Sequence, residues 1–325
     1  MGKQNWKPVL VGIDASSEAQ EAARFGWKLA QATGAQLVLV HAVREFWIPF
    51  ADEQLGERTG EIRRALLDTA RAQVTTILAD SVPTEVQERM IVRFGRAPLV
   101  LRQAAEELGA GLVILGGKHH SVLDRWTGGS TSHNSVRTLG LPVLVVAKAA
   151  DQVPRRIMVA VDVSQAAGAT IATAERYAAT FGAELKVLSV IEPPVVLPEV
   201  TPPFETADFY AMAEEALEQR VWPQVHTTAE RVVRYGQPVE SILREAHEWN
   251  ADLVIVGSHG KGWGERLMLG SVTERLLSHL PTSLLVIPAK AERVVTETVP
   301  EMPVKAKART PRKPKRGGAL AKSAR

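Results

Sequence analysis

The most informative absence in this sequence of 325 residues is cysteine. Without cysteine the chain has neither disulfide bridges nor thiolate metal ligands. Long apolar runs are also missing, and a stretch such as residues 141–147 is far too short to span a bilayer. The polar residues 1–8 contain no apolar signal core. We therefore expect a soluble, cytoplasmic protein with no transmembrane segment.

Signatures of catalysis and of a metal site are absent or weak. The sequence holds no H-E-x-x-H motif and no spacing of serine, histidine and aspartate that is typical of a catalytic triad. His119 and His120 are adjacent, but Asp124 is the one carboxylate near them, which makes a poor ligand set. The sequence therefore predicts no catalytic residue and no metal held by the protein alone.

Acidic residues are missing from residues 304–325, which contain nine Lys or Arg and no aromatic residue. The rest of the chain holds 30 basic against 36 acidic residues. Such a segment cannot bury enough apolar surface to fold, so we expect residues 291–325 to form a disordered basic tail. The tail is either a solvated terminus or a weak, salt-sensitive contact with nucleic acid or another polyanion.

What the sequence does contain is a glycine-rich stretch, residues 257–271, between an apolar run at 253–256 and a helix-like segment at 271–280. A strand, a glycine-rich loop and a helix in this order present backbone N–H groups to a phosphate. A purely structural role is the alternative. The glycines would then be turns, and Ser271 with Glu274 would form a capping box at the helix start.

The spacing of this loop differs from the two common nucleotide-binding loops, G-x-x-x-x-G-K-[ST] and G-x-G-x-x-G. Two residues separate Gly257 from Gly260, nine separate Gly260 from Gly270, and the hydroxyl of Ser271 follows. This arrangement resembles the G-2x-G-9x-G-[ST] loop of the ATP-binding branch of the universal stress protein family.

The order of apolar runs and helical periodicities occurs twice along the chain. Gly95 and Gly236 each lie 21 residues before Gly116 and Gly257. The steps from Gly116 to Gly129 and from Gly257 to Gly270 are both 13 residues. This regularity predicts an internal duplication with a period of about 140 residues, far longer than that of a solenoid.

Alternating strands and helices predict parallel sheets with helices on both faces, where ligands bind at the carboxyl ends of the strands. We expect α/β architecture with five strands in each copy: 9–14, 37–43, 87–93, 112–115 and 143–147, then 157–162, 185–191, 230–234, 253–256 and 283–287. With the resemblance, residues 1–148 and 155–290 are expected to be two tandem Rossmann-like domains of the adenine nucleotide alpha hydrolase-like type.

The resemblance also implies a site for ATP, with Mg²⁺ bound alongside the nucleotide. In ATP-binding members the aspartate after the first strand contacts the nucleoside, the end of the second strand contacts the base, and the glycine loop with its hydroxyls holds the phosphates. Carried onto the second copy, these positions are Val161, Asp162, Val190, Ile191, Val256, Gly257, Ser258, His259, Gly260, Gly270, Ser271, Val272 and Thr273. Asp162 alone is equally a strand-end turn residue.

The first copy departs from the family pattern because His119 replaces the second glycine of the loop. A Cβ at this position can block close approach of a ligand or forbid the backbone angle that glycine allows. We therefore expect weak or absent nucleotide binding at the corresponding site, which consists of Asp14, Gly116, His119, Gly129 and Ser130.

The expected function is that of a regulatory stress-response module that binds ATP and hydrolyses it slowly at most. The alternatives are a dimeric stress scaffold without nucleotide, and an enzyme, which would need a general base beside the phosphates. Family members dimerise through their last strands, here residues 143–147 and 283–287. We expect these strands to pair the two copies as a pseudo-dimer within the chain, and a homodimer of chains stays open.

Overall fold

The computed structural model describes residues 6–44, 56–117, 131–147, 153–193, 206–259, 269–280 and 282–289. All of them belong to one compact unit, residues 1–292. Four predicted site residues (His119, Gly129, Ser130 and Gly260) and the basic tail lie outside the described residues. Within the described ranges, no helix is long and apolar enough to cross a bilayer.

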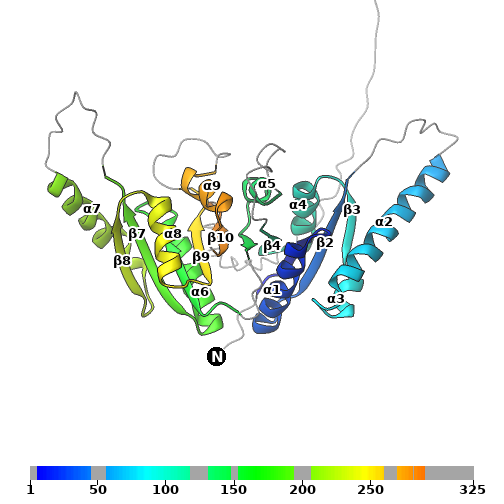
Figure 1. Cartoon of the computed structure of the whole chain (residues 1–325), viewed down its shortest axis with the longest axis horizontal. Coiled ribbons are helices and arrows are strands. Elements are labelled where there is room, and N and C mark those ends of the chain that lie inside the picture. Colours follow the sequence, from blue (N-terminus) through cyan, green and yellow to red (C-terminus); the bar gives the residue numbers. More distant parts are fainter. Residues whose placement is uncertain are drawn as a thin grey trace, which may run out of the picture. The chain divides into compact units, whose positions relative to one another are not determined.

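Strands and helices alternate in two copies of one pattern, coloured from blue to green and from green to orange (Figure 1). The first copy holds β1 (Val9–Ile13), α1 (Ser17–Thr33), β2 (Leu37–Val43), α2 (Gly56–Leu78), α3 (Thr84–Glu88), β3 (Ile91–Phe94), α4 (Ala97–Leu108), β4 (Leu112–Gly116), α5 (Thr131–Thr138) and β5 (Val143–Val146). The second copy holds β6 (Arg156–Ala160), α6 (Ala167–Phe181), β7 (Glu184–Ile191), α7 (Thr206–Arg220), a short 3-10 helix (Trp222–Gln224), β8 (Glu230–Tyr235), α8 (Pro238–Glu248), β9 (Leu253–Gly257), α9 (Ser271–Ser278) and β10 (Ser283–Ile287).

All these strands form one ten-stranded sheet in the order β3-β2-β1-β4-β5-β10-β9-β6-β7-β8. Neighbouring strands within each copy are parallel, whereas β5 and β10 pair antiparallel. The expected α/β fold class is therefore confirmed. In each copy the chain order reverses beside the first strand, between β1 and β4 and between β6 and β9, and such a switch point is where open α/β sheets bind ligands.

The sheet is covered by apolar layers on both faces because successive side chains of a strand point to opposite sides. Val9 and Val11 of β1 pack in one layer with α1, α2, α6 and α7, whereas Leu10 packs in the other with α4, α5, α8 and α9. Strands buried on both faces have nearly continuous apolar sequences. That property made most of them recognisable from the sequence.

Local signals fix the ends of several helices. The Ser16 hydroxyl accepts the N–H of Ala19 at 3.2 Å and caps α1. Gly34 ends this helix, with φ of 74° and its N–H bonded to the carbonyl of Ala30. The left-handed residue after α4 is Gly109, and at the equivalent position after α8 Asn250 takes φ of 52°, which asparagine tolerates better than most residues.

The predicted third strand, residues 87–93, is wrong at its beginning. Residues Thr84–Glu88 form the short helix α3, and β3 starts at Ile91. The N–H groups of Val86 and Gln87 bond to the carbonyl of Pro83, which starts a helical turn. The buried side-chain amide of Gln87 then donates to the carbonyl of Val82 at 2.7 Å. This side-chain bond is local in sequence, but it depends on the burial of a polar residue, which the apolar pattern does not reveal.

The two copies meet through their last strands, as the sequence predicts. In the β5–β10 pair Leu144 lies opposite Leu285, and the flanking pairs follow on either side. Because Leu144 and Leu285 occupy equivalent positions in the two copies, the pairing has local pseudo-twofold symmetry. The flanking helices α5 and α9 add an ion pair between Arg137 and Glu274 at 2.7 Å.

A buried charge cluster distinguishes the second copy from the first. Nζ of Lys186 on β7 lies 2.6 Å from Oε1 of Glu245 on α8, and both side chains are at most 6% exposed. Arg234 on β8 holds the other oxygen of Glu245 at 2.7 Å. The Lys186 ammonium also lies 4.8 Å from the ring centre of Trp249. Here the β7–β8 side of the sheet is fixed to α8 by charge as well as by apolar packing.

Candidate functional site

A cavity of about 600 Å³ lies at the carboxyl ends of β6, β7 and β9, at the switch point of the second copy. Its volume is within the range of roughly 300–1,000 Å³ that is usual for small-molecule sites. The lining contains most of the predicted residues: Val161, Asp162, Val190, Ile191, Val256, Gly257, His259, Gly270, Ser271, Val272 and Thr273. Residues from four separate segments of the sequence therefore meet around one space.

Hydrogen bonds tie together the two ends of the glycine-rich loop. The N–H of Gly270 bonds to the carbonyl of Ser258 at 2.8 Å. The Thr273 hydroxyl donates to the carbonyl of Gly257, also at 2.8 Å. Thr273 is 4% exposed, and its only hydroxyl hydrogen is used in this bond. It therefore fixes the loop to α9 and can meet a ligand only through its backbone N–H or as an acceptor.

Ser258 is the one described residue of the predicted set that does not line the cavity. Its N–H bonds to the carbonyl of Ile287 at 2.7 Å. Its buried hydroxyl accepts the N–H of Ala289 at 3.2 Å and is bonded to Nδ1 of His259 at 2.7 Å. Ser258 thus anchors the loop to the end of β10 and orients the imidazole of His259, which does line the cavity.

Asp162 follows β6 and is half-buried in the lining of the cavity. Its Oδ1 accepts the N–H of Ser164 at 3.1 Å. Asp162 therefore does act as a strand-end turn residue, which was one of the two interpretations of the sequence. A carboxylate has about four acceptor sites, so this turn bond is compatible with accepting hydroxyl groups from a ligand as well.

The start of α9 is arranged differently from a capping box. Gly270 is the N-cap residue, Ser271 is already the first helical residue, and no side chain caps the helix. Glu274, the proposed partner of Ser271, instead pairs with Arg137 of the first copy. Because the first N–H groups of a helix have no partner within it, α9 offers donors and a positive dipole end to an anion in the cavity.

An apolar wall of the cavity was missed by the sequence analysis. It includes Phe209 and Ala213 of α7 and Pro238 and Ile242 of α8, together with Pro193 after β7. These residues belong to no common sequence motif, and the spacing of the glycines gives no information about them. The helical pattern of α7 is only weakly amphipathic, so it did not mark a face that would meet the cavity.

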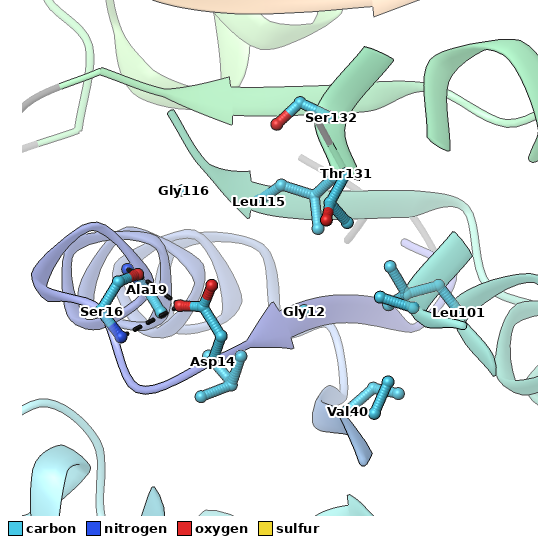
Figure 2. Close-up of a pocket in the computed structure, with 13 residues that line it drawn as sticks. Gly12, Asp14, Ser16, Ala19, Val40, Leu101, Leu115, Gly116, Thr131 and Ser132 are labelled. Atoms are coloured by element: carbon cyan, nitrogen blue, oxygen red, sulfur yellow. Dashed lines mark hydrogen bonds between the residues drawn. The ribbon is translucent and has the colours of Figure 1, made fainter. Parts of the chain in front are cut away.

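The equivalent cavity of the first copy measures about 100 Å³ (Figure 2). Asp14 and Gly116 of the predicted weaker site line it, with Thr131 and Ser132 at the start of α5. Figure 2 shows Asp14 beside the start of α1, where its carboxylate accepts the N–H of Ser16 at 3.0 Å and also the hydroxyl of Ser16. A cavity of this volume is far smaller than the sites that usually hold a nucleotide.

The first turn of α1 accounts for part of this difference. A Cβ added to Gly116 would lie 2.6 Å from the backbone carbonyl of Glu18, so the helix backbone packs directly on this glycine. At the equivalent Gly257, an added Cβ would find no atom closer than the carbonyl oxygen of His259 at 3.3 Å. Among the described residues, the second copy therefore leaves open the space that α1 fills in the first.

The lining of the larger cavity favours an anionic, hydroxyl-bearing ligand with an apolar part. The lining contains helix donors at the start of α9, a carboxylate after β6, and apolar side chains from α7 and α8. No group of three or more His, Asp or Glu side chains that could hold a metal ion occurs among the residues described.

Comparisons with known proteins agree with this architecture. The model of the universal stress protein family matches residues 5–147 and 154–288. A universal stress protein of Mycolicibacterium smegmatis is 27% identical over 293 residues, which cover 86% of this chain and 96% of that protein. A universal stress protein of Mycobacterium tuberculosis is 28% identical over 288 residues, which cover 83% and 92% of the two chains.

Solved structures show the same fold at lower sequence identity. The crystal structure of a universal stress protein from Archaeoglobus fulgidus is 18% identical, with a TM-score of 0.58, and the match covers 88% of this chain and 99% of that one. The family model covers both copies of the repeat, and the relatives match across both. This chain therefore belongs to the universal stress protein family, as a member with two domains in tandem.

Proposed function

We propose that this protein is an ATP-binding regulatory module of the stress response, in which residues 155–290 form the domain that holds the nucleotide. The observation that carries the proposal is the single cavity in which Asp162, the end of β7 and the start of α9 meet. Each supplies a different chemistry that ATP requires. Residues 1–148 form a second domain whose small cavity supports weak or absent binding.

The residues fit the nucleotide in size and in donor set. A cavity of about 600 Å³ has room for a nucleoside triphosphate. Asp162 would accept from the ribose hydroxyls, and the backbone of Val190 and Ile191 would meet the edge of the base. The N–H groups of Ser271 and Val272, at the positive end of α9, would hold phosphate oxygens. Mg²⁺ would be bound mainly through those phosphates.

We infer regulation rather than rapid turnover. Efficient hydrolysis needs a general base within hydrogen-bond reach of the attacking water. The carboxylates among the described lining residues, Asp162 and Glu192, follow β6 and β7. Those are the strand ends assigned to ribose and base, whereas the phosphates are assigned to α9. The cytoplasm stays the compartment in which we expect this module to act.

Isothermal titration of the full chain with MgATP tests the proposal, and the duplication supplies a matched control. Asp162→Asn should weaken binding about tenfold or more, because a charged acceptor for hydroxyl groups is lost. Asp14→Asn makes the same change in the first copy and should leave the affinity unchanged. A wild-type protein that binds no MgATP at millimolar concentration contradicts the proposal and favours the scaffold without nucleotide.

A further inference from the structure

Part of the apolar wall of the larger cavity is formed by one face of α7. Phe209 and Ala213 are four residues apart, so they lie one above the other on the same side of the helix, and both line the cavity. Met212, three residues after Phe209 and on the solvent-exposed flank of the helix, is 68% exposed. The orientation of α7 is therefore set so that an aromatic ring, rather than a polar side chain, faces the ligand space.

The ring of Phe209 is supported by further aromatic residues. It packs edge to face on Tyr210, with ring centres 5.7 Å apart. Tyr210 packs in the same way on Tyr235 of β8 at 5.0 Å. The hydroxyl of Tyr235 is bonded to the carboxylate of Glu214, one turn further along α7. These contacts fix α7 to the edge of the sheet and restrict the position of Phe209.

Other apolar side chains line the same cavity. They are Ile191 at the end of β7, Pro193 shortly after it and Ile242 of α8. Polar groups near the end of β7 are the strand-end backbone at Val190 and Ile191 and the carboxylate of Glu192. Apolar walls with hydrogen-bonding groups at one edge suit a flat heterocycle, which has apolar faces and a polar rim.

The first copy has no corresponding aromatic wall among its described residues. Its cavity is lined from β1, β2, β4 and the helices α1, α4 and α5, and no described residue of α2, the counterpart of α7, contributes. The aromatic wall is thus a property of the second copy. It belongs to the same cavity as the proposed ATP site but lies away from the glycine loop that suggested that site.

We propose that Phe209 is a specificity-determining residue, whose ring covers the base of a bound nucleotide and selects purines over pyrimidines. This inference rests on the proposed function, because it assigns the base to the wall formed by α7. The larger face of a purine gains more contact with the ring than a pyrimidine does. The phosphates, held at α9, contact no part of this wall.

The test uses the full chain and four variants: Phe209→Ala, Phe209→Leu, Tyr210→Leu and Met212→Ala. Calorimetry measures the affinity for MgATP, MgUTP and magnesium tripolyphosphate, which has no base. Phe209→Ala should weaken ATP binding roughly 5- to 150-fold, the usual loss for a base that stacks on an aromatic residue. The affinity for UTP should fall less than that for ATP, so the ratio of the two affinities becomes smaller. The affinity for tripolyphosphate should stay unchanged.

The remaining variants separate stacking from folding. Phe209→Leu keeps apolar volume and should lose a smaller part of the ATP preference. Tyr210→Leu should act in the same direction by releasing the ring, whereas Met212→Ala should change nothing. Equal losses for ATP and tripolyphosphate, or an unchanged ATP affinity in Phe209→Ala and Phe209→Leu, overturn the inference while the proposed function stands. Failure of wild-type protein to bind ATP overturns both.

Discussion

The two copies of the domain share an aspartate at the switch point of the sheet but differ strongly in the cavity beside it. Asp14 and Asp162 end equivalent strands, and in both copies the second residue after the aspartate, Ser16 or Ser164, gives its N–H to the carboxylate. Yet the cavity is about 100 Å³ in the first copy and about 600 Å³ in the second. A shared motif therefore does not guarantee a shared binding space.

The position at which the first helix begins explains part of the contrast. In the first copy the Ser16 hydroxyl caps the helix, and α1 starts at Ser17. In the second copy no side chain caps α6, which starts at Ala167, two residues later in the repeat. The earlier start of α1 brings the backbone of Glu18 against Gly116. The capped, earlier helix start of the first copy thus accompanies its smaller cavity.

A second contrast concerns the core on the face of α4 and α8. Ala104 of the first copy and Glu245 of the second are equivalent, since each lies nine residues after a repeated glycine, Gly95 or Gly236. The facing strand residues are Val38 in the first copy and Lys186 in the second. The first copy fills this position with apolar side chains, and the second with a buried ion pair. Buried pairs are weak contributors to stability as pairs, but breaking one is costly.

The largest effect is expected from Glu245→Ala, because it leaves the ammonium of Lys186 buried without its main partner. The loss should be about 3–5 kcal/mol in the free energy of unfolding. Urea unfolding followed by circular dichroism measures it. As a control, Glu107→Ala removes the exposed partner of Arg93 in the first copy and should change stability far less. If both variants lost similar unfolding free energy, the burial of Glu245 would add nothing to its effect on stability.

The double variant Lys186→Val with Glu245→Ala recreates the residues of the first copy. It should be clearly more stable than Glu245→Ala alone, because no buried charge is left unpaired. A double variant as unstable as the single one would indicate that lost volume, and not charge, causes the damage.

Low pH should lower the stability of the second copy through the carboxylate of Glu245. Burial by itself would raise the pKa of Glu245, but the hydrogen bonds and charges of Lys186 and Arg234 outweigh it, so its pKa lies below the usual value. A depressed pKa contributes stability above the unfolded-state value of about 4.3, and this is lost as the pH falls through the folded-state value. Below roughly pH 4.3, the wild type should therefore lose stability more steeply than the double variant, as unfolding curves at several pH values would reveal.

Alanine at the two equivalent glycines should separate packing from binding. Gly116→Ala places a Cβ 2.6 Å from the backbone of Glu18, and overpacking of this kind costs about 1–3 kcal/mol. Gly257→Ala meets its nearest atom at 3.3 Å and should cost less stability. It should nevertheless weaken MgATP binding, because the methyl group enters the lining of the larger cavity. Thermal unfolding and calorimetry on both variants check this; the reverse order of stability would contradict the structural contrast.

The smallest expected effect is that of Ser16→Ala, which removes the cap of α1. Loss of such a cap costs about 1 kcal/mol. Ser164→Ala, its counterpart, caps no helix and should change stability by a few tenths of a kcal/mol at most. Thermal unfolding of the two variants makes the comparison. Equal destabilisation would mean that the hydroxyl of Ser16 does not hold the start of α1.

The sequence by itself determined the parts of this protein that depend on local pattern. Apolar runs located nine of the strands closely because a parallel sheet buries both faces of its strands. Gly34 and Gly182 lie at helix ends because the left-handed backbone there favours glycine. The repeated glycine spacing gave the duplication, and the resemblance in the loop led to the family that the comparisons support.

Only the tertiary structure decided what these elements bring together. The helix at 84–88, the inward hydroxyl of Thr273 and the ion pair of Lys186 with Glu245 all depend on partners distant in sequence or on burial that no local pattern encodes. The same holds for Phe209, whose place in the cavity follows from how α7 packs against the sheet. Local propensity fixes where a strand or helix forms, whereas its rotation and its neighbours follow from close packing of the whole chain.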